Sequence, residues 1–335
     1  MSIPQLVVRR PPTVFMLLVL VCGLAYQPVK AQQRFEYLSY KDIDQLFQQL
    51  DYTPESWQAG IREVPRVYLT DVSDNWRDKY TKEISVTHKK RLFFRAMTPL
   101  VLRSNELILE DRAALKELRT AAGSGQLSSE QQSQLTDIAL RFRVIDEKTD
   151  TIGESDFTEL WRRVDIVPVS LALSQSAEES GWGTSRFAAE GNSLFGQWSW
   201  GKGITPQEQR TSDKGDYRIA AFETPLDSVR GYTMNLNTHN AYRELRQKRA
   251  ELRLAGQPIH GADLVSTLNR YSERGEAYVD SLRSIMSYNK LEPADDAYLG
   301  DRPPIELVPV DSYSNATACA QAEQLKGKTA ATSAC

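Results

Sequence analysis

Apolar residues recur every three to four positions along most of this chain of 335 residues, and this spacing restricts the fold more than any other feature. Ile43, Leu46 and Phe47 show the spacing early in the chain, and it is typical of the buried face of an amphipathic helix. The clearest strand pattern covers residues 216–223, which we expect to pair with residues 204–211 across a turn. The sequence therefore predicts a mainly helical α+β protein with one small β-hairpin lobe.

The N-terminal part of this pattern, residues 32–150, is expected to form an all-α region. A long apolar stripe covers residues 91–122, and Pro99 within it is expected to kink or divide the helix. Ser128 and Gln131 have the spacing of a capping box, which predicts the start of a further helix. The region contains no closely paired carboxylates, no metal-ligand spacing and no glycine-rich phosphate loop. We therefore expect it to have a structural role or to bind an envelope protein.

The first residues have the pattern of a secretory signal peptide. Arg9 and Arg10 precede an apolar run over residues 14–25, and Val29 and Ala31 are the small residues expected before a cleavage site. The run is shorter than the roughly 20 residues that span a bilayer, so a cleaved signal is favoured over an uncleaved anchor. We therefore expect an exported protein of the periplasm or cell envelope.

Charge and the distribution of histidine and cysteine exclude several function classes. The formal net charge of -3 leaves no basic excess to neutralise phosphates, so nucleic acid is not an expected partner. The three histidines have no metal-ligand spacing, and neither a metal nor a cofactor is expected. Cys319 and Cys335 lie in a polar tail, where a disulfide would order little.

Residues 168–180 form the predicted helix with the strongest candidate for catalysis. Pro168 suits the first turn of a helix, and Gly181 suits the position just past its end. Glu179 then lies in the last turn, where unpaired carbonyls raise the pKa of a carboxyl. Trp182 is expected to exclude water from the same carboxyl and to raise its pKa further. Glu179 is thus a candidate general acid, and a surface glutamate beside a helix cap is the alternative.

Residues typical of helix starts and helix ends also occur in the later part of the sequence. Thr224 and Pro225 mark a helix onset, and Gly256 marks a helix end. The other expected helices cover residues 156–164, 242–255, 262–271 and 275–289.

Four segments, in order, resemble the motifs of the bacterial glucosaminidase superfamily, glycoside hydrolase family 73, and especially its Bax-like members. They read SLALSQSAEESGWGTSRFA, GNSLFGQW, NLNTHNAYRELR and RYSERGEAYVDSLRSIM, and the resemblance covers about residues 152–290. It implies a lysozyme-like α+β fold that acts on peptidoglycan and cuts next to N-acetylglucosamine. It also implies that Glu179 is the catalytic acid.

The resemblance also implies residues that bind the substrate. Asn192, Phe195 and Gly196 fall on the NLFG loop of the family, which shapes the floor of the cleft, and Tyr278 falls on a tyrosine that lines it. Tryptophans are further candidates for stacking on sugar rings, with burial in the core as the alternative. The residues expected to bind substrate are Trp182, Asn192, Phe195, Gly196, Trp198 and Tyr278.

The family's second acidic residue lies in a mobile β-hairpin lobe, where this sequence departs from the pattern. Glu208 and Asp213 are equal candidates for this second carboxylate. A second carboxylate would activate a water or stabilise the oxocarbenium-like transition state. The alternatives are assistance by the acetamido group of the substrate, or a single glutamate, as in lytic transglycosylases.

The predicted organisation is a signal peptide (1–31), a helical N-terminal domain (32–150), a lysozyme-like glucosaminidase domain (151–292) and a disordered tail (293–335). The leading hypothesis is an exported peptidoglycan hydrolase that cleaves glycan strands at N-acetylglucosamine linkages. The alternatives are a wall-binding or scaffold protein with a degenerate cleft, a lytic transglycosylase, and an amidase or peptidase. The last of these would need a metal or a nucleophile that the sequence does not show.

Overall fold

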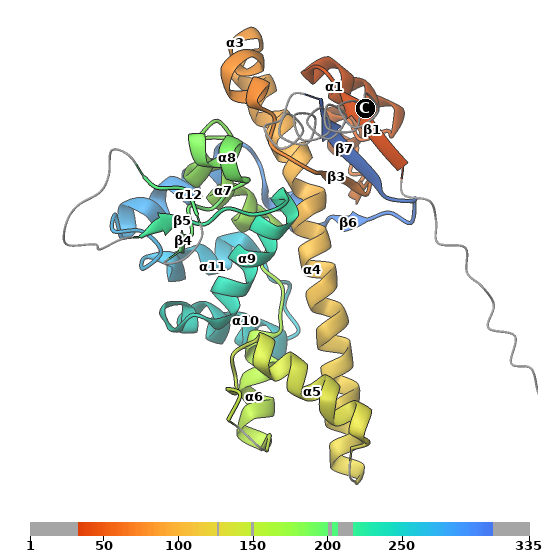
Figure 1. Cartoon of the computed structure of the whole chain (residues 1–335), viewed down its shortest axis with the longest axis vertical. Coiled ribbons are helices and arrows are strands. Elements are labelled where there is room, and N and C mark those ends of the chain that lie inside the picture. Colours follow the sequence, from red (N-terminus) through yellow and green to blue (C-terminus); the bar gives the residue numbers. More distant parts are fainter. Residues whose placement is uncertain (1–32, 126, 149–150, 200–202, 207–216, 311–335) are drawn as a thin grey trace, which may run out of the picture. The chain divides into compact units, whose positions relative to one another are not determined.

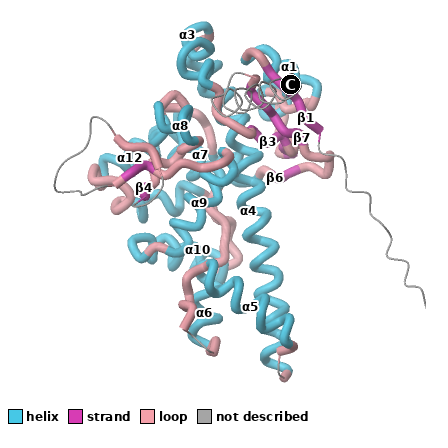
Figure 2. The backbone as a smooth tube through the Cα atoms, in the orientation of Figure 1, coloured by secondary structure: helices cyan, strands magenta, loops and turns pink. Residues whose placement is uncertain are grey.

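Helices make up most of the structure, and the strands are short (Figures 1 and 2). The computed structural model describes residues 33–125, 127–148, 151–199, 203–206 and 217–310. All of the described residues belong to one compact unit. The mainly helical α+β class predicted from the sequence is confirmed.

The α-helices of the described residues are α1 (Tyr40–Gln49), α2 (Pro54–Gln58), α3 (Thr81–Glu83), α4 (Val86–Ser124), α5 (Ser129–Arg141), α6 (Glu154–Arg163), α7 (Val169–Ser180), α8 (Arg186–Gly191), α9 (Pro225–Thr238), α10 (Arg243–Leu254), α11 (Gly261–Leu264) and α12 (Glu276–Tyr288). Short π or 3-10 helices are η1 (Trp76–Tyr80), η3 (Asn240–Tyr242), η4 (Val265–Leu268) and η5 (Glu292–Asp296). The strands are β1 (Gln33–Tyr37), β2 (Glu63–Val64), β3 (Val67–Leu69), β4 (Trp198–Ser199), β5 (Arg218–Ile219), β6 (Tyr298–Leu299) and β7 (Ile305–Pro309).

Local side-chain caps set several helix starts where the sequence predicts them. The Gln131 amide donates to Ser128 Oγ, and Gln131 Oε1 accepts from the Ser128 amide, so the capping box of α5 is confirmed. At the start of α9, Thr224 Oγ1 accepts from the Asp227 amide, and Pro225 is the first helical residue. These caps could be predicted because both partners lie within one turn of each other.

Helix α4 is the longest element of the described residues, and Pro99 does not divide it. The helix runs from Val86 to Ser124 without a break (Figure 1). Its middle, including Pro99, is buried and packs against α7 and α9. We attribute the continuity to this packing, which compensates for the hydrogen bond that proline cannot donate.

The predicted hairpin lobe consists of very short strands. β5 lies inside the predicted strand 216–223 and pairs antiparallel with β4. Ile204, in the predicted partner segment, forms an antiparallel bridge with Ile219. Residues 207–216, which contain Glu208 and Asp213, lie outside the described residues.

A parallel sheet joins the two ends of the described chain. β7 lies between β1 and β3 and is parallel to both, and β6 pairs with β2. The N-terminal region thus adds strands to its helices, which the apolar pattern did not predict. The prediction of a disordered tail from residue 293 is wrong for residues 293–310, because they contain η5, β6 and β7. Parallel pairing between distant segments leaves no local signal in sequence.

The hydrophobic core also crosses the predicted boundary near residue 150. Phe93 and Met97 of α4 belong to the same buried cluster as Leu171 and Leu173 of α7. A second cluster joins residues of α4 and α5 to Leu160 of α6. Residues on both sides of the predicted boundary therefore pack in the same two hydrophobic cores.

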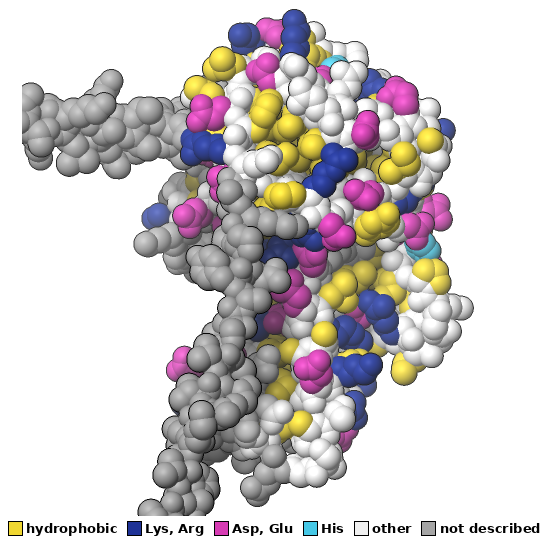
Figure 3. Space-filling model, turned by 90° about the vertical axis from the view of Figure 1, so that its right-hand side faces the viewer, with side chains coloured by type: hydrophobic (Ala, Val, Ile, Leu, Met, Phe, Trp, Pro, Cys, Tyr) yellow, Lys and Arg dark blue, Asp and Glu magenta, His cyan; other side chains and the backbone are white. Residues whose placement is uncertain are grey.

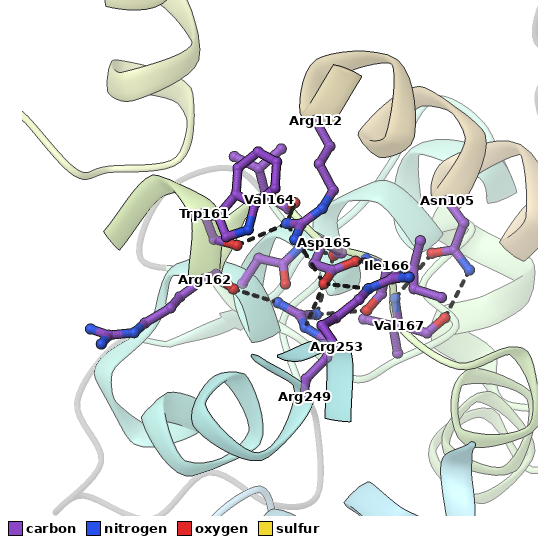
Figure 4. A network of polar contacts seen from close by, with 11 residues as sticks. Asn105, Arg112, Trp161, Arg162, Val164, Asp165, Ile166, Val167, Arg249 and Arg253 are labelled. Carbon is purple, nitrogen blue, oxygen red and sulfur yellow. Dashed lines mark hydrogen bonds and ion pairs between the residues drawn. The ribbon is translucent and has the colours of Figure 1, made fainter. Parts of the chain in front are cut away.

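Asp165, in the loop between α6 and α7, joins three arginines at the centre of a polar cluster (Figure 4). Its carboxylate lies 2.8 Å from Arg253, 3.7 Å from Arg112 and 3.9 Å from Arg249. Burial acts to raise the pKa of Asp165, but the arginines outweigh it and hold the pKa below its ordinary value. The cluster connects α4 and α10 to the loop that precedes α7.

The face of the molecule seen in Figure 3 carries charges of both signs. Lysine and arginine side chains are interspersed there with aspartate and glutamate. A surface that binds nucleic acid needs a clustered basic patch. This face therefore offers no continuous surface of that kind.

Candidate active site

The predicted helix that bears Glu179 is confirmed as α7, which begins one residue after Pro168 and ends at Gly181. Almost the whole length of α7 is buried, and small residues let its neighbours approach closely. A Cβ added to Gly261 would lie 2.2 Å from Ser170 Oγ and 2.8 Å from the Leu171 nitrogen. The serines and alanines in the motif therefore have a packing role at the centre of the domain.

The first turn of α7 is held by Asp295 of η5, in the segment that was expected to be disordered. Its carboxylate accepts hydrogen bonds from the Ser170 amide at 2.8 Å and from Ser170 Oγ at 2.7 Å. It also accepts one from the Gly261 amide at 2.9 Å. An acceptor at this position satisfies a backbone donor that the helix itself leaves free. The C-terminal segment thus positions the helix that carries the candidate acid.

The turn after α7 has an unusual backbone. Gly181, Trp182 and Gly183 all have positive φ, at 57°, 63° and 75°. Such angles suit glycine but are uncommon for a residue like tryptophan. The indole of Trp76 donates to the Trp182 carbonyl at 2.9 Å and helps to hold the turn. A turn with this uncommon backbone therefore begins two residues after Glu179.

The ring of Trp182 packs on α4. It meets the rings of Phe94 and Phe93 at 5.0 and 5.9 Å between centroids, and the Lys90 ammonium lies 4.5 Å from its centroid. These contacts give Trp182 a structural role between the two parts of the chain. Binding of sugar by Trp182 stays a prediction.

Glu179 has the raised pKa expected of a general acid. Burial raises the pKa of Glu179 to about 7, and the carboxyl of Glu178 acts in the same direction. A hydrogen bond from Tyr278 and the charge of Arg274 oppose this rise. Tyr271 and Tyr232 also lie near enough to interact with the carboxyl. The structure therefore places Glu179 beside a group of tyrosines, of which Tyr232 and Tyr278 are buried and Tyr271 is partly buried.

The loop of Phe195 and Gly196 borders the carboxyl of Glu179. A Cβ added to Gly196, which has φ 58°, would lie 3.3 Å from Glu179 Oε2. Phe195 stacks on Tyr232 at 3.9 Å between centroids, and its carbonyl accepts from the Tyr271 hydroxyl. A larger residue at position 196 would thus press on the carboxyl.

Asn192, at the start of this loop, uses its side chain to join separate segments. Its Oδ1 accepts from the Val72 amide at 2.9 Å, and its Nδ2 donates to the Glu223 carbonyl at 3.1 Å. Both ends of the amide are therefore engaged within the protein. The geometry gives Asn192 a role in positioning the loop, and contact with substrate stays a prediction.

Trp198 is the most exposed of the aromatic residues that were expected to bind sugar. Its exposed fraction is 47%, and it stacks on Tyr217 at 4.6 Å between centroids. It follows Gly196 by two residues, so its Cα lies within about 7 Å of the Cα of Gly196. An exposed aromatic residue therefore follows closely after the loop that borders the carboxyl of Glu179.

Two comparisons with known proteins match the part of the chain that contains Glu179. The sequence profile of the family described as mannosyl-glycoprotein endo-beta-N-acetylglucosaminidase matches residues 154–291. Protein bax of Escherichia coli (strain K12) is 32% identical over 207 residues, which cover 62% of this chain and 72% of that protein. The chain belongs to the Bax-like glucosaminidase-domain family. No solved structure matches it.

The glucosaminidase domain, which is of the glycoside hydrolase-like type, contains Glu179, Trp198 and Tyr278. Asp295 lies outside the matched range, although it caps the helix of Glu179. The N-terminal region lies outside the range as well, yet α4 packs on α7. Segments on both sides of the glucosaminidase domain therefore support its candidate acid.

The second acid of the glucosaminidase domain stays a prediction. Glu208 and Asp213 lie outside the described residues. Glu178, which adjoins the candidate acid, is bound by Arg274 and accepts from Ser281 Oγ at 3.0 Å. Within the described ranges, no group of three or more histidines, cysteines, aspartates or glutamates could hold a metal ion. Among those same residues, no helix is long and apolar enough to cross a bilayer.

Two buried residues near Glu179, Gln175 and Tyr232, were not predicted from the sequence. Gln175 lies four residues before Glu179, one helical turn away on the same face, and this spacing could have indicated it. Tyr232 lies on α9, and its contact with α7 has no signal in the local sequence.

Proposed function

We propose that this protein is an exported peptidoglycan hydrolase that cleaves glycan strands at N-acetylglucosamine linkages. The observation that carries the proposal is Glu179, whose pKa of about 7 keeps a large fraction of the carboxyl protonated at neutral pH. An acid with a pKa near the working pH donates its proton most effectively.

Glu179 donates its proton to the glycosidic oxygen as the bond to the sugar breaks. The sugar then acquires oxocarbenium character, which a second carboxylate or an activated water must relieve. Glu208 and Asp213 are the proposed candidates for that role. Trp198, which is exposed and stacks on the buried Tyr217, offers an aromatic face on which a sugar ring can stack.

Export of the protein is proposed from residues 1–31, which lie outside the described residues and have the pattern of a signal peptide. Peptidoglycan, the proposed substrate, lies in the compartment that such a signal reaches. The N-terminal helices are proposed to bind an envelope protein. Fractionation of cells that express the full chain tests the location.

Digestion of purified peptidoglycan by the chain from residue 32 onward tests the proposed activity. We expect soluble fragments and a rate that falls as the pH rises above about 7, where Glu179 loses its proton. Glu179→Gln should lower the rate by about 10²-fold or more. Glu190→Gln, at a surface glutamate paired with Arg186, is the matched control and should retain activity. Equal rates in all three proteins would contradict the proposal.

A lytic transglycosylase is the second candidate, because the neighbouring carboxyl of Glu178 is occupied by Arg274 and Ser281. Such an enzyme works with one acid and leaves an anhydro end. Mass spectrometry of the fragments distinguishes a hydrolysed end from an anhydro end. Saturable binding to peptidoglycan without new ends would instead indicate a wall-binding or scaffold protein.

A further inference from the structure

A chain of three buried side chains leads from α9 to Glu179. The Tyr232 hydroxyl donates to Gln175 Oε1 at 2.6 Å, and Gln175 Nε2 donates to the Tyr278 hydroxyl oxygen at 3.0 Å. Tyr278 in turn forms a side-chain hydrogen bond with Glu179. Tyr232 and Gln175 are 0% exposed and Tyr278 is 1% exposed, so water does not compete for these bonds.

The direction of each bond follows from the number of protons available. A tyrosine hydroxyl carries one proton, whereas a glutamine amide has a carbonyl oxygen at one end and an NH₂ group at the other. Tyr232 donates to the oxygen end of Gln175, so the NH₂ end faces Tyr278. Because Tyr278 accepts from this NH₂ group, its own proton remains available for Glu179. An ionised Glu179 can only accept, which agrees with this direction.

The opposite orientation of the amide would reverse the chain. The oxygen of Gln175 would then take the proton of Tyr278, and the oxygen of Tyr278 would be left to accept the proton of Glu179. A general acid in that state would point its proton into the protein and away from a substrate. The orientation of Gln175 therefore determines where the proton of Glu179 is held.

We propose that Gln175 is a positioning residue that makes Tyr278 a donor to one oxygen of Glu179 and so leaves the acid proton on the other oxygen. The inference deepens the proposed function and rests on it for the catalytic consequence. Glu179 Oε2 lies toward the loop of Gly196, and the exposed Trp198 follows Gly196 by two residues in the chain, so the proposed sugar site includes the loop that borders this oxygen. Hydrogen bonds arranged in series strengthen one another, which favours one direction for the whole chain.

The first test measures the titration of Glu179 by carboxyl ¹³C NMR in the chain from residue 32 onward, with the signal assigned by Glu179→Gln. Tyr278→Phe removes the donor to Glu179, so the pKa of Glu179 should rise. Gln175→Met has a similar size but no amide, and it should shift the titration in the same direction. The double variant should match Tyr278→Phe alone, because Gln175 acts through Tyr278.

A smaller substitution tests the same chain of hydrogen bonds while the packing of the core is kept. Tyr232→Phe keeps the ring that stacks on Phe195 and removes only the hydroxyl, and it too should raise the pKa of Glu179. Ser174→Ala is the matched control, because Ser174 is equally buried on α7 but donates to the Leu171 carbonyl, outside the chain of bonds. The control should titrate like the unchanged protein. An unchanged titration in Gln175→Met and Tyr232→Phe, or a full additional shift in the double variant, would overturn the inference.

The catalytic consequence has a separate measurement. With peptidoglycan as substrate, Gln175→Met should lower kcat about tenfold, as expected for loss of one hydrogen bond to a reacting group, and leave KM within about twofold. If the unchanged protein does not cleave peptidoglycan, the proposed function fails. The NMR titration requires no turnover, so it still decides whether Gln175 controls the hydrogen bond to Glu179.

Discussion

At the scale of single residues, Glu179 illustrates how one position combines local and distant effects. Its place near the end of α7 follows from the sequence, because Gly181 ends the helix in a left-handed conformation. Its raised pKa follows first from burial, which other elements provide. The same residue should therefore affect both activity and stability.

The stability effect has a definite sign. The pKa of Glu179 rises from an ordinary value of 4.5 to about 7 in the folded protein. The group therefore contributes stability below its unfolded pKa, and this contribution is lost as the pH rises through about 7. Glu179→Gln cannot ionise and should be the more stable protein above pH 7, by on the order of 2 kcal/mol after allowance for partial exposure.

Urea unfolding of both proteins at pH 4.5 and at pH 8 measures this difference. The two free energies of unfolding should differ more at pH 8 than at pH 4.5. An identical difference at both pH values would show that Glu179 is not a buried titrating group. The measurement does not depend on any enzymatic activity.

At the scale of elements, the polar cluster of Asp165 explains how α4 and α10 are held against the loop before α7. Arg249 is fully buried and also donates to backbone carbonyls of Asp165 and Ile166. A buried guanidinium of this kind needs a carboxylate close by. The length of α4 and the continuity at Pro99 likewise depend on neighbouring helices rather than on local preference.

Asp165→Asn should therefore destabilise the protein by about 3–5 kcal/mol, because it leaves buried arginines without their counter-charge. Chemical denaturation measures the loss. Asp111→Asn is the matched control, because Asp111 pairs with Arg141, whose side chain is about half exposed. An exposed pair contributes at most about 1 kcal/mol. Equal effects of the two substitutions would contradict a central role for the cluster.

At the scale of the whole molecule, the parallel sheet brings the last described residues back to the first. β7 is the central strand between β1 and β3, and its residues Leu307 and Val308 are buried. The C-terminal segment also supplies Asp295, which caps α7. The candidate active site thus depends on chain that lies on both sides of the glucosaminidase match.

A chain that ends at residue 303 should be less stable than a chain that ends at residue 310, because only the longer one contains β7. Burial of Leu307 and Val308 alone contributes roughly 3–5 kcal/mol. Thermal unfolding followed by circular dichroism compares the two, and we expect a clearly lower Tm for the shorter chain. The same Tm in both would show that β7 does not hold the sheet together.

The sequence by itself determined the helix of Glu179, its end at Gly181 and the caps at Ser128 and Thr224, because each depends on residues within about one turn. Only the tertiary structure decided the place of β7, since its partners lie more than 200 residues away. It also decided that Gln175, Tyr232 and Tyr278 form one hydrogen-bonded chain, because these side chains come from three helices. Short-range hydrogen bonds leave a pattern in sequence, whereas contacts between distant segments arise only when the chain packs.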